Sequence, residues 1–553
     1  MIIYAVPTAT HQLNAENMRI NATDNRNAFS PPPSGLPHPV WKRRRVIATV
    51  TLGIILVATA CVAPSPESAD KGSDRLVLET AFKNIDLRHA KETSTRAVSL
   101  AGLNTISEAD TLLAIDERTS EIALTYEDRV LGEWPIPGAT DHNGWAAVVS
   151  DALEKARQAA PKLGKQDHEV ALARFFRGAL SKLDRYTRYA TPAQARNTRA
   201  RREGFGGLGV TIRYDKGNVY VAKVREGTPA FKARLKSGDL ITHVGGITLT
   251  GLTQNAAIGH LRGPVHSKAD LTIIRKNANA PLKIAVVRGH IILPTVTSKH
   301  EDGILTIRLS GFNQGTSRSL GKVLAVAERE DGKPLRGIVL DLRSNPGGLL
   351  DQAVAVADFF LNDGRIISTK GRHLRANQIF NASWGERVTS TPIAVLVNGR
   401  SASASEIVAA ALRDRGRAIV IGASSFGKGS VQTIIRLPNG GELTLTWAHM
   451  IAPAGFNLQN HGIIPAICTS AADAELSNMM AAIRSNAPAA GTILSQALAS
   501  RYAIRTNPDL ARERCPPTRT ERAEDQEIAK YLLEHKSLYI RALRDGSAAI
   551  AER

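Results

Sequence analysis

The sequence predicts a multidomain protein of mixed α/β and β class, with an α/β core, a small β-rich module before it and helical segments at both ends. Residues 290–470 alternate strand and helix patterns, and residues 203–289 contain short alternating strands around one helix-like stretch. The length of 553 residues suits three or four domains. Hydrophobic residues at 43% and charged residues at 22% exclude a wholly disordered, collagen-like or polytopic membrane chain.

The first 63 residues indicate export from the cytoplasm. Residues 1–40 are polar and proline-rich, and we expect them to be a disordered cytoplasmic or pre-signal segment. Residues 41–63 are expected to be a signal peptide or membrane anchor, because a Lys-Arg-Arg-Arg run precedes the uncharged residues 46–63. A helix of that length spans roughly 27 Å, close to the hydrocarbon thickness of a bilayer. We therefore expect the chain to contact the membrane through this segment.

Residues 58–61, Ala-Thr-Ala-Cys, resemble a bacterial lipobox, with Ala58 where leucine is usual. Lipidation of Cys61, an uncleaved anchor and cleavage after Ala60 or Ala63 all remain open. Each alternative places the remainder of the chain on the periplasmic side of a bacterial cell envelope, as a membrane-anchored protein, a lipoprotein or a released one.

The other two cysteines, Cys468 and Cys515, could form a disulfide in that compartment or remain free thiols. No cysteine has metal-ligand spacing, so no metal site is predicted. The net charge of +20 permits attraction to anionic polymers or lipid. Because no nucleic-acid-binding motif is present, no nucleic-acid partner is predicted.

Beyond the export segment the chain divides into four parts. The N-terminal part is expected to be a mixed, mainly helical cap, in which a helical pattern runs into Asp-Arg-Tyr-Thr-Arg-Tyr at residues 184–189. The C-terminal part is rich in alanine and arginine and is expected to be a helical extension. The four parts are the cap at 64–200, the β-rich module at 203–289, the α/β core at 290–470 and the extension at 471–553.

Three polar segments follow predicted strands of the core. They are Asp-Leu-Arg-Ser-Asn-Pro-Gly-Gly at 341–348, Ser-Ala-Ser-Ala-Ser-Glu-Ile at 401–407 and Gly-Lys-Gly-Ser-Val-Gln at 427–432. In an open α/β sheet the strand ends that carry function meet at one edge, so we expect these segments to lie together. Taken singly, each segment has another interpretation. The first suits a tight turn and the second a helix N-cap. The third nearly matches a phosphate-binding loop, but Gly429 stands where that loop needs a hydroxyl.

Together the segments bring a serine and a lysine to one sheet edge. A serine hydroxyl is a weak nucleophile until a base removes its proton. Lysine can be that base only when burial lowers its pKa from about 10.4. No Gly-x-Ser-x-Gly elbow and no zinc-protease histidine pair is present.

In this order the three segments resemble those of the carboxyl-terminal processing peptidases, the tail-specific serine proteases of peptidase family S41. The resemblance extends over about residues 171–467. It implies that Ser403 is the nucleophile, that Lys428 is the general base and that Gln432 orients the lysine. It also implies an oxyanion hole made by the backbone N–H groups of Ala404 and of either Gly347 or Gly348, and it leaves the choice of glycine open. No cofactor is implied.

The β-rich module resembles the PDZ domain of the same proteases. Its Gly207-Leu208-Gly209-Val210 run matches the loop whose backbone N–H groups bind a peptide's terminal carboxylate. The resemblance therefore implies protein or peptide partners with free, apolar C-termini.

The predicted architecture is thus an α/β serine protease core with a preceding PDZ domain, a helical N-terminal cap and a helical C-terminal tail. The predicted function is that of a cell-envelope serine endopeptidase that captures protein C-termini and hydrolyses peptide bonds with a serine–lysine dyad. The alternative is a catalytically inactive PDZ-containing binding or scaffold protein on the same fold. The sequence leaves open the physiological substrate, a lipoprotein adaptor and a homo-oligomer.

Overall fold

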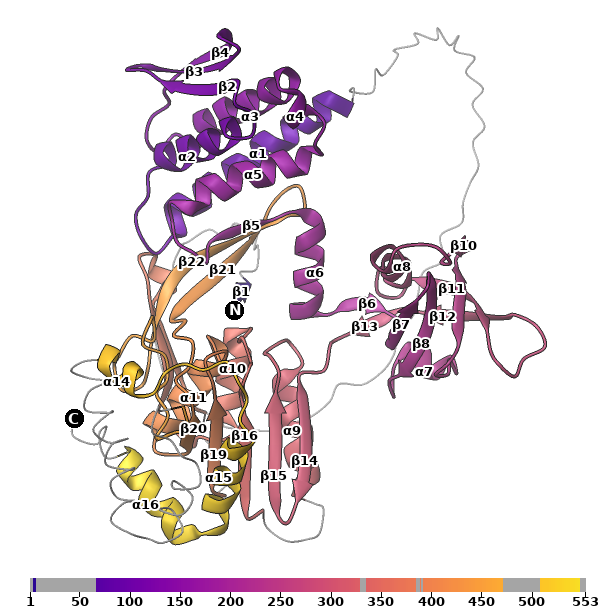
Figure 1. Ribbon diagram of the computed structural model, residues 1–553, viewed down its shortest axis with the longest axis vertical. Helices are drawn as coiled ribbons and strands as arrows, with labels where there is room; N and C mark the ends of the chain where they lie inside the picture. The colour runs from indigo at the N-terminus through magenta and orange to yellow at the C-terminus, as the bar shows by residue number, and fades with distance from the viewer. Residues whose placement is uncertain are drawn as a thin grey trace, which may run out of the picture. The chain divides into compact units, whose positions relative to one another are not determined.

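The computed structural model describes residues 3–5, 66–328, 335–383, 388, 391–470 and 508–547 (Figure 1). The predicted signal peptide or anchor and Cys61 lie outside the described residues, as does the rest of the segment 1–40 beyond strand β1 (Ile3–Ala5). Among the helices that are described, none combines the length and apolar character that a membrane span needs.

A six-stranded sheet forms the centre of the α/β core. The strand order is β14 (Val296–Glu301), β15 (Ile304–Leu309), β16 (Gly337–Asp341), β19 (Ile393–Val397), β20 (Ile419–Gly422) and β23 (Ile467–Cys468). All neighbouring pairs are parallel except β14 and β15. Every residue of β16, β19 and β20 is buried, which explains why these strands are continuous apolar runs in the sequence.

Helices cover both faces of this sheet. One face packs against α9 (Thr316–Ala327), α10 (Leu350–Asp358) and α11 (Ala404–Asp414). The other packs against α15 (Ala523–Glu534) and α16 (Lys536–Ser547), which are yellow in Figure 1. Helices α15 and α16 of the C-terminal extension are therefore a structural layer of the core, a role that the composition of the extension did not reveal.

The extension also forms polar contacts with the core. The Tyr539 hydroxyl donates to the Ile393 carbonyl at 3.0 Å and accepts from the Ile393 N–H at 2.9 Å. Arg343, in the loop after β16, donates to Asp341 at 2.9 Å and to Asp525 of α15 at 3.1 Å. Removing α15 would leave Arg343 with an unpaired donor in a buried site, which is costly.

A second sheet adjoins the core. Its order is β1, β21 (Ser430–Arg436), β22 (Glu442–Ile451), β17 (Arg365–Lys370) and β18 (Gln378–Asn381), and β5 (Arg188–Ala190) also pairs with β22. The β21–β22 hairpin connects the second sheet to the cap, because Leu443 and Leu445 of β22 pack in the same apolar cluster as Phe175 and Phe176 of the cap.

The N-terminal cap consists of helices around a three-stranded meander. Its elements are α1 (Pro66–Arg88), α2 (Thr95–Ser107), β2 (Leu113–Glu117), β3 (Glu121–Tyr126), β4 (Arg129–Pro135), α3 (His142–Ala159), α4 (Pro161–Gly164) and α5 (His168–Ser181). Trp145 and Phe82 are buried at its centre. Helix α6 (Pro192–Glu203) then leads to the β-rich module, and the Thr191 side chain caps its N-terminus.

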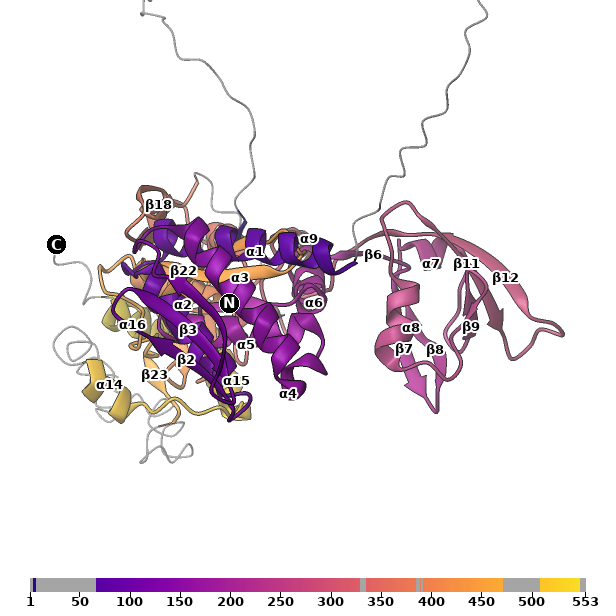
Figure 2. The same ribbon diagram turned by 90° about the horizontal axis from the view of Figure 1, so that it is seen from above.

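The β-rich module has its own sheet and its own apolar cluster. The order is β12 (Leu282–Val287), β11 (Lys268–Ile274), β9 (Leu240–Val244), β8 (Asn218–Val224) and β7 (Val210–Asp215), with β10 (Ile247–Thr248) on β9. Figure 2 shows this sheet with its helices α7 (Pro229–Lys232) and α8 (Gln254–Leu261). Strands β6 (Phe205–Gly207) and β13 (Gly289–Ile291) pair where the chain enters and leaves the module.

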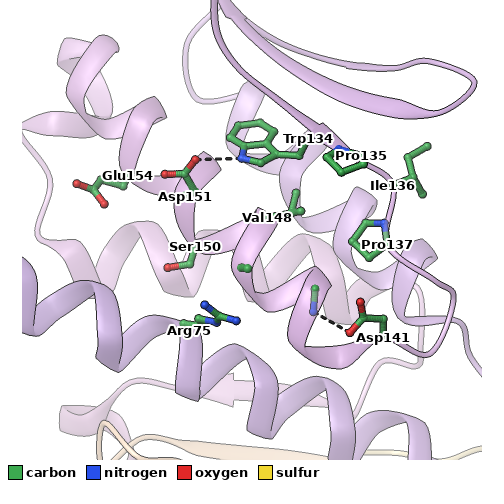
Figure 3. A pocket seen from close by; sticks show the side chains of 12 residues that line it. Arg75, Trp134, Pro135, Ile136, Pro137, Asp141, Val148, Ser150, Asp151 and Glu154 are labelled. Carbon is green, nitrogen blue, oxygen red and sulfur yellow. Dashed lines mark hydrogen bonds between the residues drawn. The ribbon is translucent and has the colours of Figure 1, made fainter.

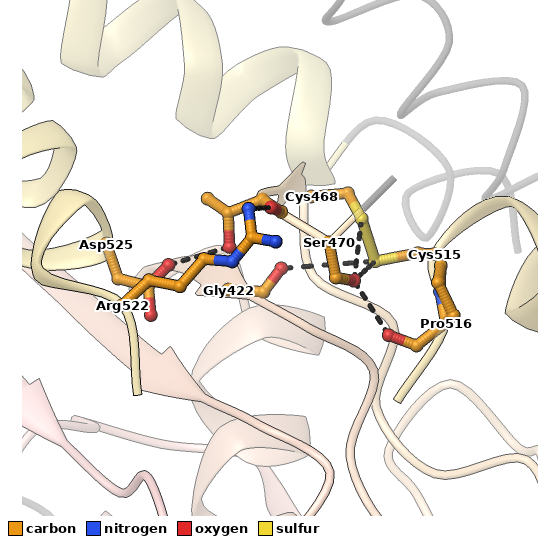
Figure 4. The surroundings of a disulfide bond; sticks show 8 residues. Gly422, Cys468, Ser470, Cys515, Pro516, Arg522 and Asp525 are labelled. Atoms are coloured by element: carbon orange, nitrogen blue, oxygen red, sulfur yellow. Dashed lines mark hydrogen bonds between the residues drawn. A yellow bond between two sulfur atoms is a disulfide. The ribbon is translucent and has the colours of Figure 1, made fainter. Parts of the chain in front are cut away.

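A disulfide joins Cys468, at the end of β23, to Cys515, which follows α14 (Pro508–Arg514) (Figure 4). Of the two states that the sequence leaves open for this pair, the structure has the bonded one, with the Cα atoms 5.9 Å apart. The Ser470 hydroxyl beside it donates to the Pro516 carbonyl at 2.7 Å, and the Thr469 hydroxyl donates to Asp525 at 2.6 Å. The bond thus fixes the segment between α14 and α15 to the edge of the core sheet.

We predict that replacing both cysteines by serine lowers the free energy of unfolding by about 2–4 kcal/mol. The cross-link closes a loop with a sequence separation of 47 residues, so its removal gives freedom back to the unfolded chain. Urea unfolding with and without a reductant measures the effect. The reduced parent should match the double variant, and equal stability of the oxidised parent and the variant would contradict the prediction.

Candidate active site

The three polar segments predicted from the sequence meet at one edge of the core sheet. They follow β16, β19 and β20 and are joined by hydrogen bonds between their backbones and side chains. The Ser401 hydroxyl donates to the Leu342 carbonyl at 2.8 Å, and the Phe426 N–H donates to the Ser401 carbonyl at 3.0 Å. The Ala402 N–H donates to the Asn345 carbonyl at 3.0 Å. The loops therefore form one bonded unit.

Ser403 lies at the N-terminal end of α11, and its side chain is buried. Its backbone has φ 64° and ψ −112°, a conformation that non-glycine residues rarely adopt and that costs about 1–3 kcal/mol. Such strain persists only where the surroundings enforce it, so the contacts around Ser403 decide its position.

Glu406, one turn into the same helix, supplies the strongest of these contacts. Its buried carboxylate accepts hydrogen bonds from the N–H groups of Ser403 at 2.6 Å, Gly427 at 2.7 Å and Lys428 at 2.9 Å. It also accepts from the Ser425 hydroxyl. One side chain therefore holds the serine loop and the lysine loop in a fixed relation.

Burial raises the pKa of Glu406, and the hydrogen bonds from Ser425, Ser403, Gly427 and Lys428 oppose that rise. All four partners are donors. A carboxylate can accept from every one of them, whereas a protonated carboxyl would turn one O–H toward a group that also donates.

Lys428 is 7% exposed, and its Nζ lies 4.8 Å from the centroid of the Tyr186 ring. Burial, together with the nearby positive charge of Arg188, lowers the pKa of Lys428 to about 8. At pH 7 about one molecule in ten would then hold a neutral lysine amine, compared with fewer than one in a thousand at the ordinary pKa.

Gln432, in β21, is completely buried. Its Nε2 donates to the Ser430 hydroxyl at 2.9 Å and to the Thr446 hydroxyl at 3.4 Å. Within the described part of the chain its Oε1 has no hydrogen-bond partner. Burying an acceptor without a hydrogen-bond partner costs about 1–3 kcal/mol of stability. The Gln432 Oε1 is therefore available to accept a hydrogen bond from a nearby donor.

The two glycines of the first loop differ in their contacts. The Gly347 N–H already donates to Asn345 Oδ1 at 2.9 Å. Among the described residues, the N–H groups of Gly348 and Ala404 donate to no acceptor. Gly347 has another constraint, since a Cβ there would lie 2.6 Å from the Ala402 carbonyl oxygen and 2.9 Å from Ser403 Cβ. Only glycine permits this approach to Ser403.

Lys428 and Ala402 line a pocket of about 470 Å³. Its other lining residues are Tyr186, Ser344, Pro346, Gly399, Arg400, Phe426 and Arg519. No carboxylate is among them. The pocket is large enough for a side chain of an extended peptide beside the serine loop.

The predicted carboxylate-binding loop lies between β6 and β7. Leu208 is buried, and its carbonyl accepts from the Ala230 N–H at 2.8 Å. Gly209 has φ 86°, and a Cβ there would lie 2.3 Å from Thr228 Cβ. In the described structure the N–H groups of Leu208 and Gly209 have no acceptor, so both are free to bind an anion.

A larger pocket, of about 700 Å³, lies in the cap (Figure 3). Figure 3 shows it between the end of β4 and helix α3, with Trp134 donating to Asp151 at 3.0 Å. None of its lining residues belongs to the three loops at the edge of the core sheet. Among the described residues, no group of three histidine, cysteine or acidic side chains could hold a metal ion.

The structure thus brings Ser403, Lys428, Ala404 and the glycine pair together at one edge, with Gln432 in the adjoining strand β21. Sequence reasoning missed the role of Glu406, although this residue lies inside the serine segment. It also missed Tyr186, which lies in the run at 184–189 and contacts Lys428 from the cap side.

Comparison with known proteins identifies two domains. Residues 303–469 match peptidase family S41, and residues 206–286 match the PDZ domain. The carboxy-terminal-processing protease of Bartonella bacilliformis is 41% identical over 303 residues, which are 54% of this chain and 70% of that protein. A probable CtpA-like serine protease of Staphylococcus aureus strain N315 is 33% identical over 305 residues, 54% of this chain and 60% of that protein.

Among solved structures, the photosystem II D1 C-terminal processing protease aligns with 71% of this chain and 92% of its own, at 22% identity and a TM-score of 0.35.

We predict that Glu406→Gln lowers the free energy of unfolding by about 3 kcal/mol or more, because the new amide group turns a donor toward other donors in a buried site. Denaturant unfolding measures this. The matched control is Asp351→Asn, which removes an exposed carboxylate from the first turn of α10 and should change stability by less than about 0.5 kcal/mol. Equal stabilities of the two variants would show that the carboxylate does not hold the loops.

Proposed function

Because the chain belongs to peptidase family S41, the carboxy-terminal-processing serine proteases, and carries a PDZ domain, we propose that it cleaves peptide bonds with Ser403 as nucleophile and Lys428 as general base. The observation that carries this proposal is the Glu406 carboxylate, which binds the backbone N–H groups of both residues. The lowered pKa of Lys428 supports it, because only a neutral amine can accept a proton.

The reaction divides into two steps. Lys428 Nζ takes the Ser403 hydroxyl proton while Oγ attacks the scissile carbonyl carbon, and the same proton then passes to the leaving amine. This gives an ester on Ser403 and releases the C-terminal product. Water then attacks the ester, with Lys428 again as base, and frees the acid.

Two backbone N–H groups suit the negative oxygen that forms in each step. We assign them to Ala404 and Gly348, since the Gly347 N–H is already bonded to Asn345. Each oxyanion donor is worth about 2.7–4 kcal/mol in such sites. The buried Oε1 of Gln432 would accept from Lys428 and orient it.

The PDZ domain would bind the substrate's C-terminus. The free N–H groups of Leu208 and Gly209 suit a terminal carboxylate, and the edge of β7 suits an added peptide strand. Apolar residues around this loop favour an apolar terminal side chain. Binding of the substrate's C-terminus to the PDZ domain would raise the local concentration of the substrate at Ser403.

We propose the cell envelope as the place of action. The Lys-Arg-Arg-Arg run at residues 42–45, followed by the uncharged residues 46–63, supports export. The Cys468–Cys515 disulfide suits an oxidising compartment. Substrates would then be envelope proteins whose C-termini are free and unfolded.

Cleavage of an unfolded protein with an apolar C-terminus tests the dyad. We expect Ser403→Ala and Lys428→Ala to lose at least about 1,000-fold in kcat, because each removes a participant in bond breaking. The matched controls Ser298→Ala and Lys182→Ala change exposed residues and should retain parental rates. Amidating the substrate's C-terminus should raise KM for the parent. Carboxylate-dependent binding without any cleavage by the parent would instead favour the scaffold alternative.

The pH dependence of kcat gives a second prediction. Since the base is active only when neutral, kcat should rise with pH, reach half its plateau near pH 8 and fall about tenfold for each pH unit below pH 7. Single-turnover rates between pH 6 and 10 measure the profile. A half-maximum near pH 10.5 would show that Lys428 is not desolvated, and one near pH 6.5 would point to a histidine base instead.

A further inference from the structure

The turn that follows helix α5 contains Asp184, a carboxylate to which the proposed mechanism assigns no role. Asp184 in this turn accepts from the N–H groups of Tyr186 at 2.8 Å and Thr187 at 3.1 Å, and from the Thr187 hydroxyl at 2.6 Å. It also accepts from His89 Nε2 at 3.0 Å and from the Thr446 hydroxyl at 2.9 Å. Five donors fill both oxygens, although the side chain is 24% exposed.

Two of these donors lead to the surroundings of Lys428. Tyr186 carries the ring that lies 4.8 Å from Lys428 Nζ, and its N–H bond to Asp184 fixes the backbone that bears this ring. Thr446 contacts Gln432 Nε2 at 3.4 Å. The Asp184 carboxylate therefore contacts both Tyr186 and Thr446, and these two residues lie next to Lys428 and Gln432 respectively.

The contact with Thr446 also determines which way round the Gln432 amide lies. A carboxylate only accepts, so the Thr446 hydroxyl has to give its one proton to Asp184. The hydroxyl oxygen can then only accept from Gln432, which requires the NH₂ group on that side. Oε1 is left on the other side, where it is buried without a partner in the described structure.

We propose that Asp184 is a positioning residue for the general base: through Thr446 it fixes the Gln432 amide with Oε1 available to Lys428, and through Tyr186 it holds the aromatic ring against the lysine. This rests on the proposed function, in which Lys428 is the base. The hydrogen bonds described for Asp184 go to His89, Tyr186, Thr187 and Thr446, and none goes to Ser403 or Lys428.

The ionisation of Asp184 supports the direction of these bonds. Burial raises the pKa of this carboxyl, but hydrogen bonds from His89, Thr187, Tyr186 and Thr446 outweigh burial and hold the pKa below its ordinary range. The group therefore stays an acceptor at every pH at which a lysine base would operate.

The first test compares Thr446→Val with Thr446→Ser in the full-length protein. Valine has the shape of threonine without the hydroxyl. The Gln432 amide then keeps only the Ser430 hydroxyl, which can accept or donate and so permits either orientation of the amide. The kcat of Thr446→Val should fall about 10- to 100-fold with KM unchanged within twofold. Serine keeps the hydroxyl and should restore kcat to within about threefold of the parent. Equal kcat values for the two variants would overturn the proposal, and so would a loss confined to KM.

The second test combines Asp184→Asn with Gln432→Ala. Alone, Asp184→Asn should lower kcat about 10- to 100-fold, because asparagine can donate to Thr446 and reverse the chain of bonds. In the Gln432→Ala background it should lower kcat by a clearly smaller factor, since the amide it orients is gone. What remains acts through Tyr186 and through the charge of Asp184, which raises the pKa of Lys428. If the fold-loss in kcat of the double variant equals the product of the two single losses, Asp184 acts on the fold and not through Gln432. Asp141→Asn is the control, because Asp141 likewise accepts from a backbone N–H, at the start of α3 in the same cap.

The two proposals fail in different ways. Activity retained by Lys428→Ala would overturn the proposed dyad. An inactive Lys428→Ala together with parental Asp184→Asn and Thr446→Val would overturn only the positioning role. Thermal unfolding of each variant identifies any that do not fold, and if Asp184→Asn is one of them, the threonine pair decides.

Discussion

Four donors from two loops converge on the Glu406 carboxylate, and the geometry of the site depends on that convergence. The serine loop and the lysine loop follow different strands, and their backbones carry N–H groups that would be buried without an acceptor. A single anion satisfies them and fixes the distance between the loops. The same contact holds the strained backbone of Ser403, whose φ of 64° would otherwise relax.

The position of this anion depends in turn on the layers of the core. Helix α11, which carries Glu406, packs on one face of the sheet, and α15 packs on the other. Arg343 connects the far layer to the first loop through Asp341 and Asp525. The cap contributes from a third direction, because Tyr186 lies against Lys428. Each layer therefore fixes a different part of the same small site.

Much of this arrangement could be predicted from the sequence, since it follows from local patterns. The buried strands β16, β19 and β20 are continuous apolar runs, and the polar segment after each is the loop that the structure places at the sheet edge. Parallel strands bring such loops together whatever their separation along the chain. The β-rich module was also predicted from local patterns, namely its short alternating strands and the glycine loop at its start.

What the sequence did not reveal depends on contacts that local sequence patterns do not specify. From the sequence, Glu406 is an ordinary acidic residue in the first turn of a helix, and only the structure shows its partners at 425–428. Gly347 and Gly348 look equivalent until Asn345 is found to occupy one N–H. The amphipathic helices of the extension require an apolar partner, but periodicity does not say which surface that is.

The last two described helices, α15 and α16, bear on how the protein would itself behave as a substrate. Under the proposed function, a C-terminus must become extended before it can be cut, and helices α15 and α16 would have to leave the sheet to do so. Their departure would expose Val339 and Leu396 to water and leave Arg343 without Asp525. Digestion of these helices would therefore disable the enzyme that performs it. Under the proposed function, the packing of α15 and α16 on the sheet would therefore oppose their digestion by the same enzyme.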